Sequence, residues 1–540
     1  MKKKIIICCA AVVLLFVGTS FKNDFFEISK QIEIFTTLFK ELNMNYVDDT
    51  NPGELMDTAI KSMLEDLDPY TNFLNEQDVA NYRINQSGEY SGIGASIRTF
   101  ENKLIIIEPY KGYPADVAGL KAGDEIVKID DIVIKDFNDN AGDLLKGAPN
   151  STIQITYKRQ GEQFTTEVKR QGIEIDAVPF YGKIDETTGY IVLERFNNKA
   201  SKQVKEALED LKGQGVNKLV LDLRNNPGGL LREAIDICNL FVDKDEVIVT
   251  TQSKVKKFNQ TYKTKKKPVD TEIPLVVLVN GRSASASEIV SGALQDLDRA
   301  VVIGDRSFGK GLVQRPLKLS YGTQLKVTIS RYYTPSGRCI QALDYWHRDA
   351  NNNAVRTQEK DFNAFQTKNG RTVYDGGGIM PDIQVASAKN SDFTKSLIND
   401  YVIFDYVNDY YYNNTVKSAA DFEFSDGDYN RFKRFVLKSD FNFETETEKK
   451  LKNLLTKNEL EALGNDVKIS YQNLLSTLEN NKEQALDTYK TEIRHAIEND
   501  IIKHYFYKEG LYTYNLTHDE SVVIATKLLK DSPKYNSILQ

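Results

Sequence analysis

The chain has 540 residues, of which 41% are hydrophobic and 27% charged, so it can form roughly three or four domains with separate cores. It carries 70 Lys and Arg against 77 Asp and Glu, a net charge of −7, which argues against nucleic acid as the main partner. Only four Cys and four His are present, and no two His residues stand at HExxH spacing. A Cys-rich zinc site or a zinc-protease site is therefore not expected.

Residues 1–20 have the composition of a secretory signal peptide or an uncleaved membrane anchor. MKKK supplies a positive start, residues 5–17 form an apolar run, and Gly18 and Ser20 provide small residues for cleavage. The apolar run is short for a bilayer span, which needs about 20 residues. We therefore expect an exported protein, periplasmic or in the cell envelope, that touches the membrane only through this segment.

Four regions with different patterns follow this leader. Residues 21–84 carry apolar side chains at helical spacing, and residues 85–172 consist of short β-branched runs separated by Gly, Pro and Asp turns. In residues 173–388, strand-like runs alternate with helical stretches, as expected for an α/β core. Residues 389–540 again have helical periodicity. The predicted fold class is multidomain, with an α/β domain, a β-rich domain and helical regions at both ends.

The β-rich region contains a loop that could bind an anion. In the segment SGIGASI, residues 91–97, successive backbone amides could converge on a terminal carboxylate. These amides belong to Gly92, Ile93, Gly94 and Ala95. The loop is followed by YPADVAGLKAGDEIVKIDD, residues 113–131, and together the two segments resemble a PDZ domain, in which a peptide C-terminus adds as a strand beside a groove. The alternative is a β-bulge at Gly92 and Gly94 that binds no ligand.

The first notable junction of the α/β core is LVLDLRNNPGGLL, residues 219–231, where an apolar strand ends in Asn, Pro and Gly before a helix. Glycines let backbone amides approach a ligand closely, and a helix start presents unpaired N–H groups. Gly228 or Gly229 could thus supply half of an oxyanion hole. An ordinary tight turn between strand and helix is the alternative.

The second junction is LVVLVNGRSASASEIVSGALQD, residues 275–296, which predicts a strand, a turn of small residues and a helix. Such a turn would raise the Ser285 hydroxyl to the mouth of the sheet, as a nucleophile elbow does in another fold. Ser285 and Glu288 also satisfy the capping-box pattern, a structural task worth about 1 kcal/mol. The two interpretations are compatible, because a serine at a helix start lies beside amides that can stabilise an oxyanion.

The third junction offers a base for that serine. No His occurs between residues 21 and 346, but AVVIGDRSFGKGLVQ, residues 300–314, holds Lys310 between two glycines. A lysine acts as a base only when neutral, so burial must lower its pKa from about 10.4 toward 7, a cost of about 4 kcal/mol. The segment also matches a phosphate-binding loop, but Gly311 stands where Mg²⁺ coordination needs Ser or Thr. An NTPase is therefore the weaker interpretation.

Several motifs agree in order and spacing: LRNNPGG, SASASEI, FGKGLVQ, YYTPSGRCIQ and GGGIMPDI stand behind the PDZ-like segment. In these motifs the chain resembles the C-terminal processing, or tail-specific, serine proteases over most of residues 25–388. The resemblance implies a crotonase-like α/β protease core and no metal or cofactor. It also implies a site composed of the nucleophile Ser285, the base Lys310, the lysine-orienting Gln314, and oxyanion donors at Ala286 and at Gly228 or Gly229. Asp296 matches an acidic position of the family near the site, with a solvated or helix-pairing aspartate as the alternative.

The implied function is that of a serine endopeptidase that recognises free, apolar C-terminal tails of exported proteins through its PDZ domain and cleaves or degrades them. The resemblance also implies that the PDZ domain lies over an active-site tunnel. The alternative is a non-enzymatic PDZ adaptor or chaperone with an inert core, against which the intact serine, lysine and glutamine weigh. The lysine-rich stretch 253–268 predicts a solvated hairpin rather than a site for an anionic polymer. Whether the helical tail serves a homo-oligomer or a lipoprotein adaptor stays open.

Overall fold

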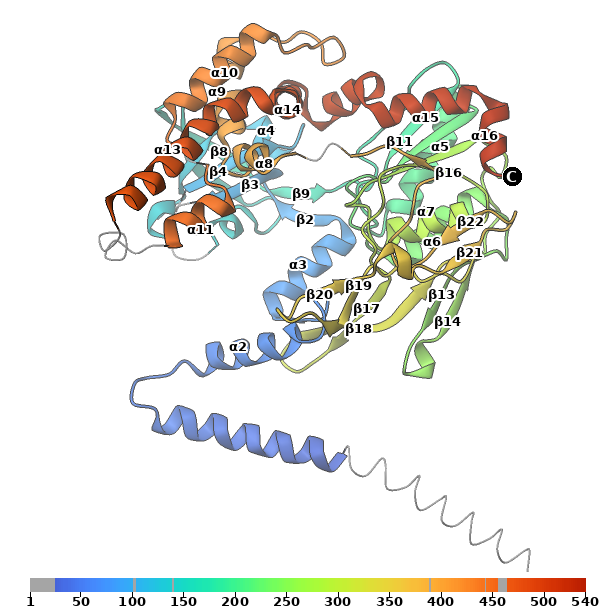
Figure 1. Ribbon diagram of the computed structural model, residues 1–540, viewed down its shortest axis with the longest axis horizontal. Coiled ribbons are helices and arrows are strands. Elements are labelled where there is room, and N and C mark those ends of the chain that lie inside the picture. The colour runs from blue at the N-terminus through green and yellow to red at the C-terminus, as the bar shows by residue number, and fades with distance from the viewer. Residues whose placement is uncertain (1–24, 101–102, 138–139, 388–389, 442, 455–463) are drawn as a thin grey trace, which may run out of the picture. The chain divides into compact units, whose positions relative to one another are not determined.

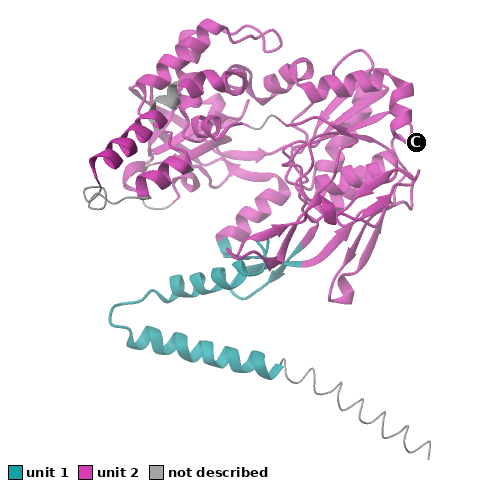
Figure 2. Cartoon of the chain, in the orientation of Figure 1, with its two compact units in different colours: residues 1–76, 314–328 teal, residues 77–313, 329–540 magenta. Residues whose placement is uncertain are grey.

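The computed structural model describes residues 25–100, 103–137, 140–387, 390–441, 443–454 and 464–540. The predicted leader, residues 1–20, lies outside this described part. The chain divides into two compact units: residues 1–76 with 314–328 form unit 1, and residues 77–313 with 329–540 form unit 2 (Figure 2). Among the helices described, none combines the length and the hydropathy that crossing a bilayer requires.

Unit 1 contains the larger part of the region, residues 21–84, for which the periodicity predicts helices, and residues 77–84 belong to unit 2. A helix covers residues 25–45 and is followed by α2 (Pro52–Glu65) and β1 (Asn72–Leu74). The side chain of Asn51 accepts hydrogen bonds from the first amides of α2, and Pro52 stands in its first turn, which explains where this helix begins. β1 pairs antiparallel with the first half of β18 (Gln324–Tyr333).

The β-rich region of unit 2 folds as predicted into a small antiparallel domain (Figure 1). Its sheet has the order β3-β4-β5-β7-β8, so β3 is an edge strand. In β7 every second side chain is buried, and Ile153 and Ile155 join the core of this domain. The elements are α3 (Glu76–Ser87), β2 (Glu89–Gly92), β3 (Ala95–Phe100), β4 (Lys103–Pro109), α4 (Pro114–Val117), β5 (Glu125–Ile129), β6 (Ile132–Val133), η1 (Ile134–Asp136), η2 (Ala141–Leu145), β7 (Thr152–Arg159), β8 (Glu162–Lys169) and β9 (Gln171–Glu174).

The α/β core is built on a six-stranded sheet of order β10-β11-β12-β15-β16-β23, parallel except at β10. Strand β15 is buried on both faces: Val277 packs with helices α5, α6 and α7, whereas Val276 packs on the opposite face. The elements are β10 (Phe180–Lys183), β11 (Thr188–Val192), α5 (Ala200–Gly213), β12 (Lys218–Asp222), α6 (Leu231–Phe241), β13 (Val247–Gln252), η3 (Lys256–Phe258), β14 (Gln260–Lys263), β15 (Leu275–Val279), α7 (Ala286–Asp296), β16 (Val301–Gly304), β17 (Leu312–Lys318), β19 (Leu343–Arg348), β20 (Ala354–Arg356), η4 (Glu359–Asp361), β21 (Ala364–Gln366), β22 (Thr372–Tyr374) and β23 (Ile383–Gln384).

The lysine-rich stretch 253–268 includes β14, which pairs antiparallel with β13, and its lysines are mostly exposed. This confirms the predicted hairpin. Because the turn of the hairpin holds η3, the stretch has a defined backbone rather than an irregular one.

The helical C-terminal domain is present, and its last two helices also complete the core. Its elements are α8 (Asp392–Asn399), α9 (Val402–Asn413), α10 (Asp426–Lys438), α11 (Glu446–Leu454), α13 (Asn465–Thr488), α14 (Lys490–His518), α15 (Glu520–Lys530) and α16 (Ser532–Ile538). Helix α14 breaks at Tyr507, whose φ of 58° and ψ of −169° are not helical. Helices α15 and α16 then cover the second face of the core sheet, where Val522 and Tyr535 pack with Val276. The region after residue 389 is therefore not wholly separate from the core.

Candidate active site

Ser285 lies at the junction of β15 and α7 in a conformation that few non-glycine residues adopt. Its φ is 55° and its ψ is −109°, and its side chain is partly exposed. A backbone at positive φ is strained for a residue with a Cβ, and such strain persists only where the surroundings hold it. The turn thus has the geometry expected of a serine presented at the end of a strand.

The carboxylate of Glu288 holds this turn against the loop that carries Lys310. Its Oε2 accepts hydrogen bonds from the backbone N–H groups of Ser285 at 2.7 Å and Lys310 at 2.9 Å. Its Oε1 accepts from the Ser307 hydroxyl and the Gly309 N–H, both at 2.6 Å. The residue is completely buried. One carboxylate oxygen therefore lies within hydrogen-bond distance of the amides of the candidate nucleophile and the candidate base.

Burial raises the pKa of Glu288 above its ordinary value, and the four hydrogen bonds that it accepts act in the opposite direction. The sequence pattern indicates only the capping box for this residue, and its contact with the Ser285 amide is the N3 half of that box. The pattern does not predict the contact of Glu288 with the Lys310 loop, because the groups that donate to it there, in residues 307–310, come from a separate loop later in the chain. The signal that could have found it is a charged residue within a stretch of small and apolar residues.

Further hydrogen bonds connect the loop of Ser285 with the loop of Lys310. The buried hydroxyl of Tyr332 donates to the carbonyl of Ser285 at 3.2 Å, and the backbone N–H of Tyr332 donates to the carbonyl of Gly311 at 2.9 Å. The loops also meet directly, where the N–H of Phe308 donates to the carbonyl of Ser283 at 3.1 Å. The positions of the two loops are therefore coupled at several points.

The glycine pair after β12 lies beside Ser285. A Cβ on Gly228 would stand 2.9 Å from the Cβ of Ser285 and 2.7 Å from the carbonyl oxygen of Ala284, so only glycine fits there. Gly229 faces the opposite way, because a Cβ on it would lie 2.4 Å from the carbonyl oxygen of Phe196. Gly228 and Ala286 therefore lie beside the candidate serine, whereas Gly229 follows Gly228 in the chain and faces Phe196.

Gln314 and Asp296 have other surroundings. Gln314 belongs to unit 1, where its side-chain amide donates to the Thr328 hydroxyl at 3.1 Å. Asp296 stands at the end of α7, roughly 16 Å along the helix from Ser285. There it accepts a hydrogen bond from the fully buried guanidinium of Arg338 at 2.7 Å. The expectation of an acidic group near the site is wrong for Asp296, whose carboxylate neutralises a buried arginine.

The loop of Gly92, Ile93, Gly94 and Ala95 enters the edge strand β3, as the PDZ resemblance implies. Gly94 has a φ of 72°. The carbonyl of Ile93 accepts from the Ala115 N–H at 2.8 Å, and the carbonyl of Gly94 accepts from the Tyr110 N–H at 2.9 Å. Because C=O and N–H point in opposite directions across a trans peptide, the amides of Gly94 and Ala95 point away from the body of the domain.

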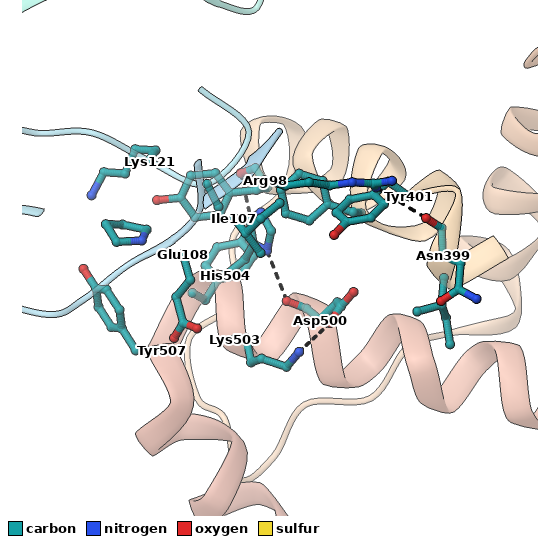
Figure 3. Close-up of a pocket in the computed structure, with 16 residues that line it drawn as sticks. Arg98, Ile107, Glu108, Lys121, Asn399, Tyr401, Asp500, Lys503, His504 and Tyr507 are labelled. Atoms are coloured by element: carbon teal, nitrogen blue, oxygen red, sulfur yellow. Dashed lines mark hydrogen bonds and ion pairs between the residues drawn. The ribbon is translucent and has the colours of Figure 1, made fainter. Parts of the chain in front are cut away.

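A cavity of about 490 Å³ lies between the β-rich domain and the helical domain, and none of the predicted site residues lines it. Figure 3 shows Arg98 and Glu108 from the strands opposite Asp500, Lys503 and His504 from α14. The guanidinium of Arg98 stacks 3.4 Å from the centre of the Tyr401 ring. The cavity is therefore part of a domain junction and not of the serine site.

His504 makes this junction sensitive to pH. Burial lowers the pKa of His504 from 6.5 to about 4, with Lys503 acting in the same direction and Asp500 against it. Between pH 6.5 and 4 the unfolded chain therefore binds a proton at this imidazole that the folded chain does not bind. The contribution of His504 to the free energy of unfolding is fully present above pH 6.5 and is lost as the pH drops toward 4, by up to about 3 kcal/mol. We expect His504→Gln to weaken this dependence, as measured by urea unfolding at pH 7.0 and 4.5. An equal loss of stability in variant and wild type would contradict the assignment.

Comparison with known proteins gives three family matches and several relatives. The family models are Peptidase family S41 over residues 187–344, the PDZ domain over residues 91–169, and "Probable PDZ-protease, C-terminal helical domain" over residues 393–529. A carboxy-terminal-processing protease of Bartonella bacilliformis is 37% identical over 322 residues, which are 58% of this chain and 73% of that protein. A carboxyl-terminal-processing protease of Picosynechococcus is 38% identical over 293 residues, 53% of this chain and 70% of that protein.

Among solved structures, a photosystem II D1 C-terminal processing protease is 27% identical. The match covers 66% of this chain and 93% of that one, with a TM-score of 0.36. The family matches lie in the order predicted from the motifs, with the PDZ domain before the protease core and the helical domain after it. Together with relatives whose length is covered by more than two thirds, they show that the chain belongs to the carboxy-terminal-processing proteases, serine peptidases of family S41 that contain a PDZ domain and hydrolyse peptide bonds.

Proposed function

We propose that this protease captures the free, apolar C-terminal tails of exported proteins in its PDZ domain and cleaves those proteins with a Ser285–Lys310 dyad. The observation that carries the dyad is the shared Glu288 oxygen, which accepts from the backbone amides of both residues. Two residues whose backbone amides share one acceptor oxygen have neighbouring main chains, and a nucleophile and its base require such neighbouring positions.

In the proposed reaction, the neutral amine of Lys310 removes the Ser285 proton as the hydroxyl oxygen attacks the substrate carbonyl. The resulting ammonium then gives that proton to the departing amine, which leaves an acyl-enzyme. Lys310, neutral again, next takes a proton from water, and the hydroxide formed attacks the ester. As the ester breaks, the Lys310 ammonium returns that proton to the departing Ser285 oxygen, which restores both the serine and the neutral lysine. Gln314 keeps its predicted role of orienting the lysine on the strength of the FGKGLVQ motif.

We assign the oxyanion donors to the amides of Ala286 and Gly229. The N–H of Gly228 is already used, because it donates to the side chain of Asn226 at 2.8 Å. The carbonyl of Gly228 accepts from the N–H of Phe196 at 3.1 Å, so across the trans peptide the N–H of Gly229 points away from Phe196. In the described part of the chain, neither the Gly229 nor the Ala286 amide has a hydrogen bond to another group, which suits donors kept for a developing negative charge.

The proposal of tail recognition is tested with one unstructured protein substrate prepared with a free and with an amidated C-terminus. We expect kcat/KM to fall at least tenfold on amidation, because the loop amides of the PDZ domain need a carboxylate to bind. Casein serves as the control for activity that does not depend on a defined tail. Equal cleavage of the two substrates would overturn tail recognition, and no cleavage of any substrate would favour the inert adaptor.

A further inference from the structure

A cavity of about 330 Å³ runs along the edge strand of the PDZ domain and has walls from three elements. Ile97 of β3 forms one side and Leu145 of η2 another. The third wall is α3, the helix before the PDZ domain, from which Asn81, Ile84 and Asn85 line the space. These three positions lie on one face of the helix, since residues three and four apart are neighbours. The groove therefore extends beyond the sequence range that the PDZ family model matches.

The opening of this cavity suits a peptide with a free carboxylate. Strand β3 is at the edge of its sheet, so its outer backbone groups can accept another strand. The amides of Gly94 and Ala95 point out of the domain, as derived above from their peptide planes. The ammonium group of Lys146, also a lining residue, is paired with Asp143 at 2.8 Å, so the two together add no net charge to the groove. Backbone donors and an apolar wall are thus present in one groove.

Helix α3 is anchored beside this groove. Its last turn closes with the N–H of Gly88 donating to the carbonyl of Ile84 at 2.7 Å, and the carbonyl of Gly88 accepts from the Ile175 N–H at 2.7 Å. The carbonyl of Gln86 accepts from the Asn198 N–H of the protease core at 3.0 Å. Gly88 has a φ of 71°, and a Cβ there would lie 2.4 Å from the side chain of Asn197. The helix is therefore fixed at its C-terminal end, next to the residues that line the cavity.

We propose that α3 is part of the tail-binding site and helps to decide which C-termini are bound. The side-chain amides of Asn81 and Asn85 donate hydrogen bonds to the terminal carboxylate, and Ile84 packs against the apolar side chain of the last residue. Neutral amide donors suit this place, because they complement the carboxylate without adding the desolvation cost of another charge. This inference rests on the tail recognition proposed above and extends it to residues outside the PDZ domain.

The test measures peptide binding by the whole chain carrying Ser285→Ala, so that the peptide is not cleaved. A fluorescent ten-residue peptide with two apolar residues and a free carboxylate at its end is compared with the amidated peptide by fluorescence anisotropy. In the double variant Asn81→Ala, Asn85→Ala, we expect the Kd for the free peptide to rise about tenfold and the Kd for the amidated peptide to stay within twofold. The matched control is Arg83→Ala, which shortens an exposed side chain of the same helix that does not line the cavity.

Each outcome decides a different point, provided that the melting temperatures of the variants agree. A tenfold weaker Kd in the double variant, with Arg83→Ala within twofold of the parent, supports α3 as a wall of the site. An unchanged Kd in the double variant, while amidation of the peptide still weakens binding tenfold, overturns the role of α3 and leaves tail recognition intact. If the double variant and Arg83→Ala weaken binding of the free peptide equally, the role of α3 is also overturned. If the parent does not bind the free peptide, both this inference and tail recognition are wrong.

Discussion

Replacement of Ser285 by alanine is expected to lower kcat on an unstructured substrate by at least about 10⁴-fold, the effect seen when a nucleophile is removed from a serine protease. Lys310→Ala is expected to cost at least about 10³-fold, since the hydroxyl then has no base. The two losses should not add in the double variant, because nucleophile and base act as one unit. Casein hydrolysis by the purified proteins measures all three.

The pH dependence and a chemical probe separate this mechanism from a general loss of structure. If Lys310 is the base, wild-type activity rises with pH as its ammonium loses a proton. A fluorophosphonate should label Ser285 in the wild type, more slowly in Lys310→Ala, and not at all in Ser285→Ala. Lys254→Ala, in the exposed lysine-rich stretch, is the matched control and should keep full activity. Labelling of another residue, or wild-type hydrolysis by Ser285→Ala, would refute the assignment.

Glu288→Gln should reduce kcat by at least about 10²-fold while KM changes little. Glutamine keeps the shape of the side chain but replaces one acceptor oxygen with a donor NH₂ group. If that group takes the Oε2 position, it faces the amides of Ser285 and Lys310, and at the Oε1 position it faces the amide of Gly309. A displacement of about 1 Å between reacting groups is enough for a loss of this size. The loss appears in kcat because the carboxylate orients the reacting residues and is buried away from substrate.

A buried carboxylate can also matter only for folding, so the experiment needs a control for stability. Glu492→Gln supplies it, because Glu492 likewise accepts hydrogen bonds from the start of a helix, at Ser391 and Thr394, but lies in the helical domain. We expect both variants to lose stability, and only Glu288→Gln to lose kcat per active site, counted by fluorophosphonate titration. Glu288→Asp keeps both oxygens and should restore part of the activity. A kcat within threefold of wild type in folded Glu288→Gln would show that Glu288 does not position the dyad.

The sequence alone determined the elements that depend on local pattern. Short apolar or β-branched runs, such as those that form β7 and β15, predicted both β-containing domains, because turn residues or helical stretches separate these runs along the chain. The placement of Ser285 at a strand-to-helix turn and of Lys310 in a glycine-flanked loop could likewise be read from neighbouring residues. The identities of residues within a few positions of each other are sufficient for such predictions, because helices and strands repeat their backbone geometry every two to four residues.

Only the tertiary structure decided which distant residues meet. The bonds of Glu288 to the Lys310 loop, the different neighbours of Gly228 and Gly229, and the pairing of Asp296 with Arg338 all depend on how separate segments are brought together. The same holds for α15 and α16, whose periodicity indicates helices but not the sheet face that they cover. The physical reason is that periodicity shows which face of an element is apolar, while the partner of that face is selected by the topology of the whole chain.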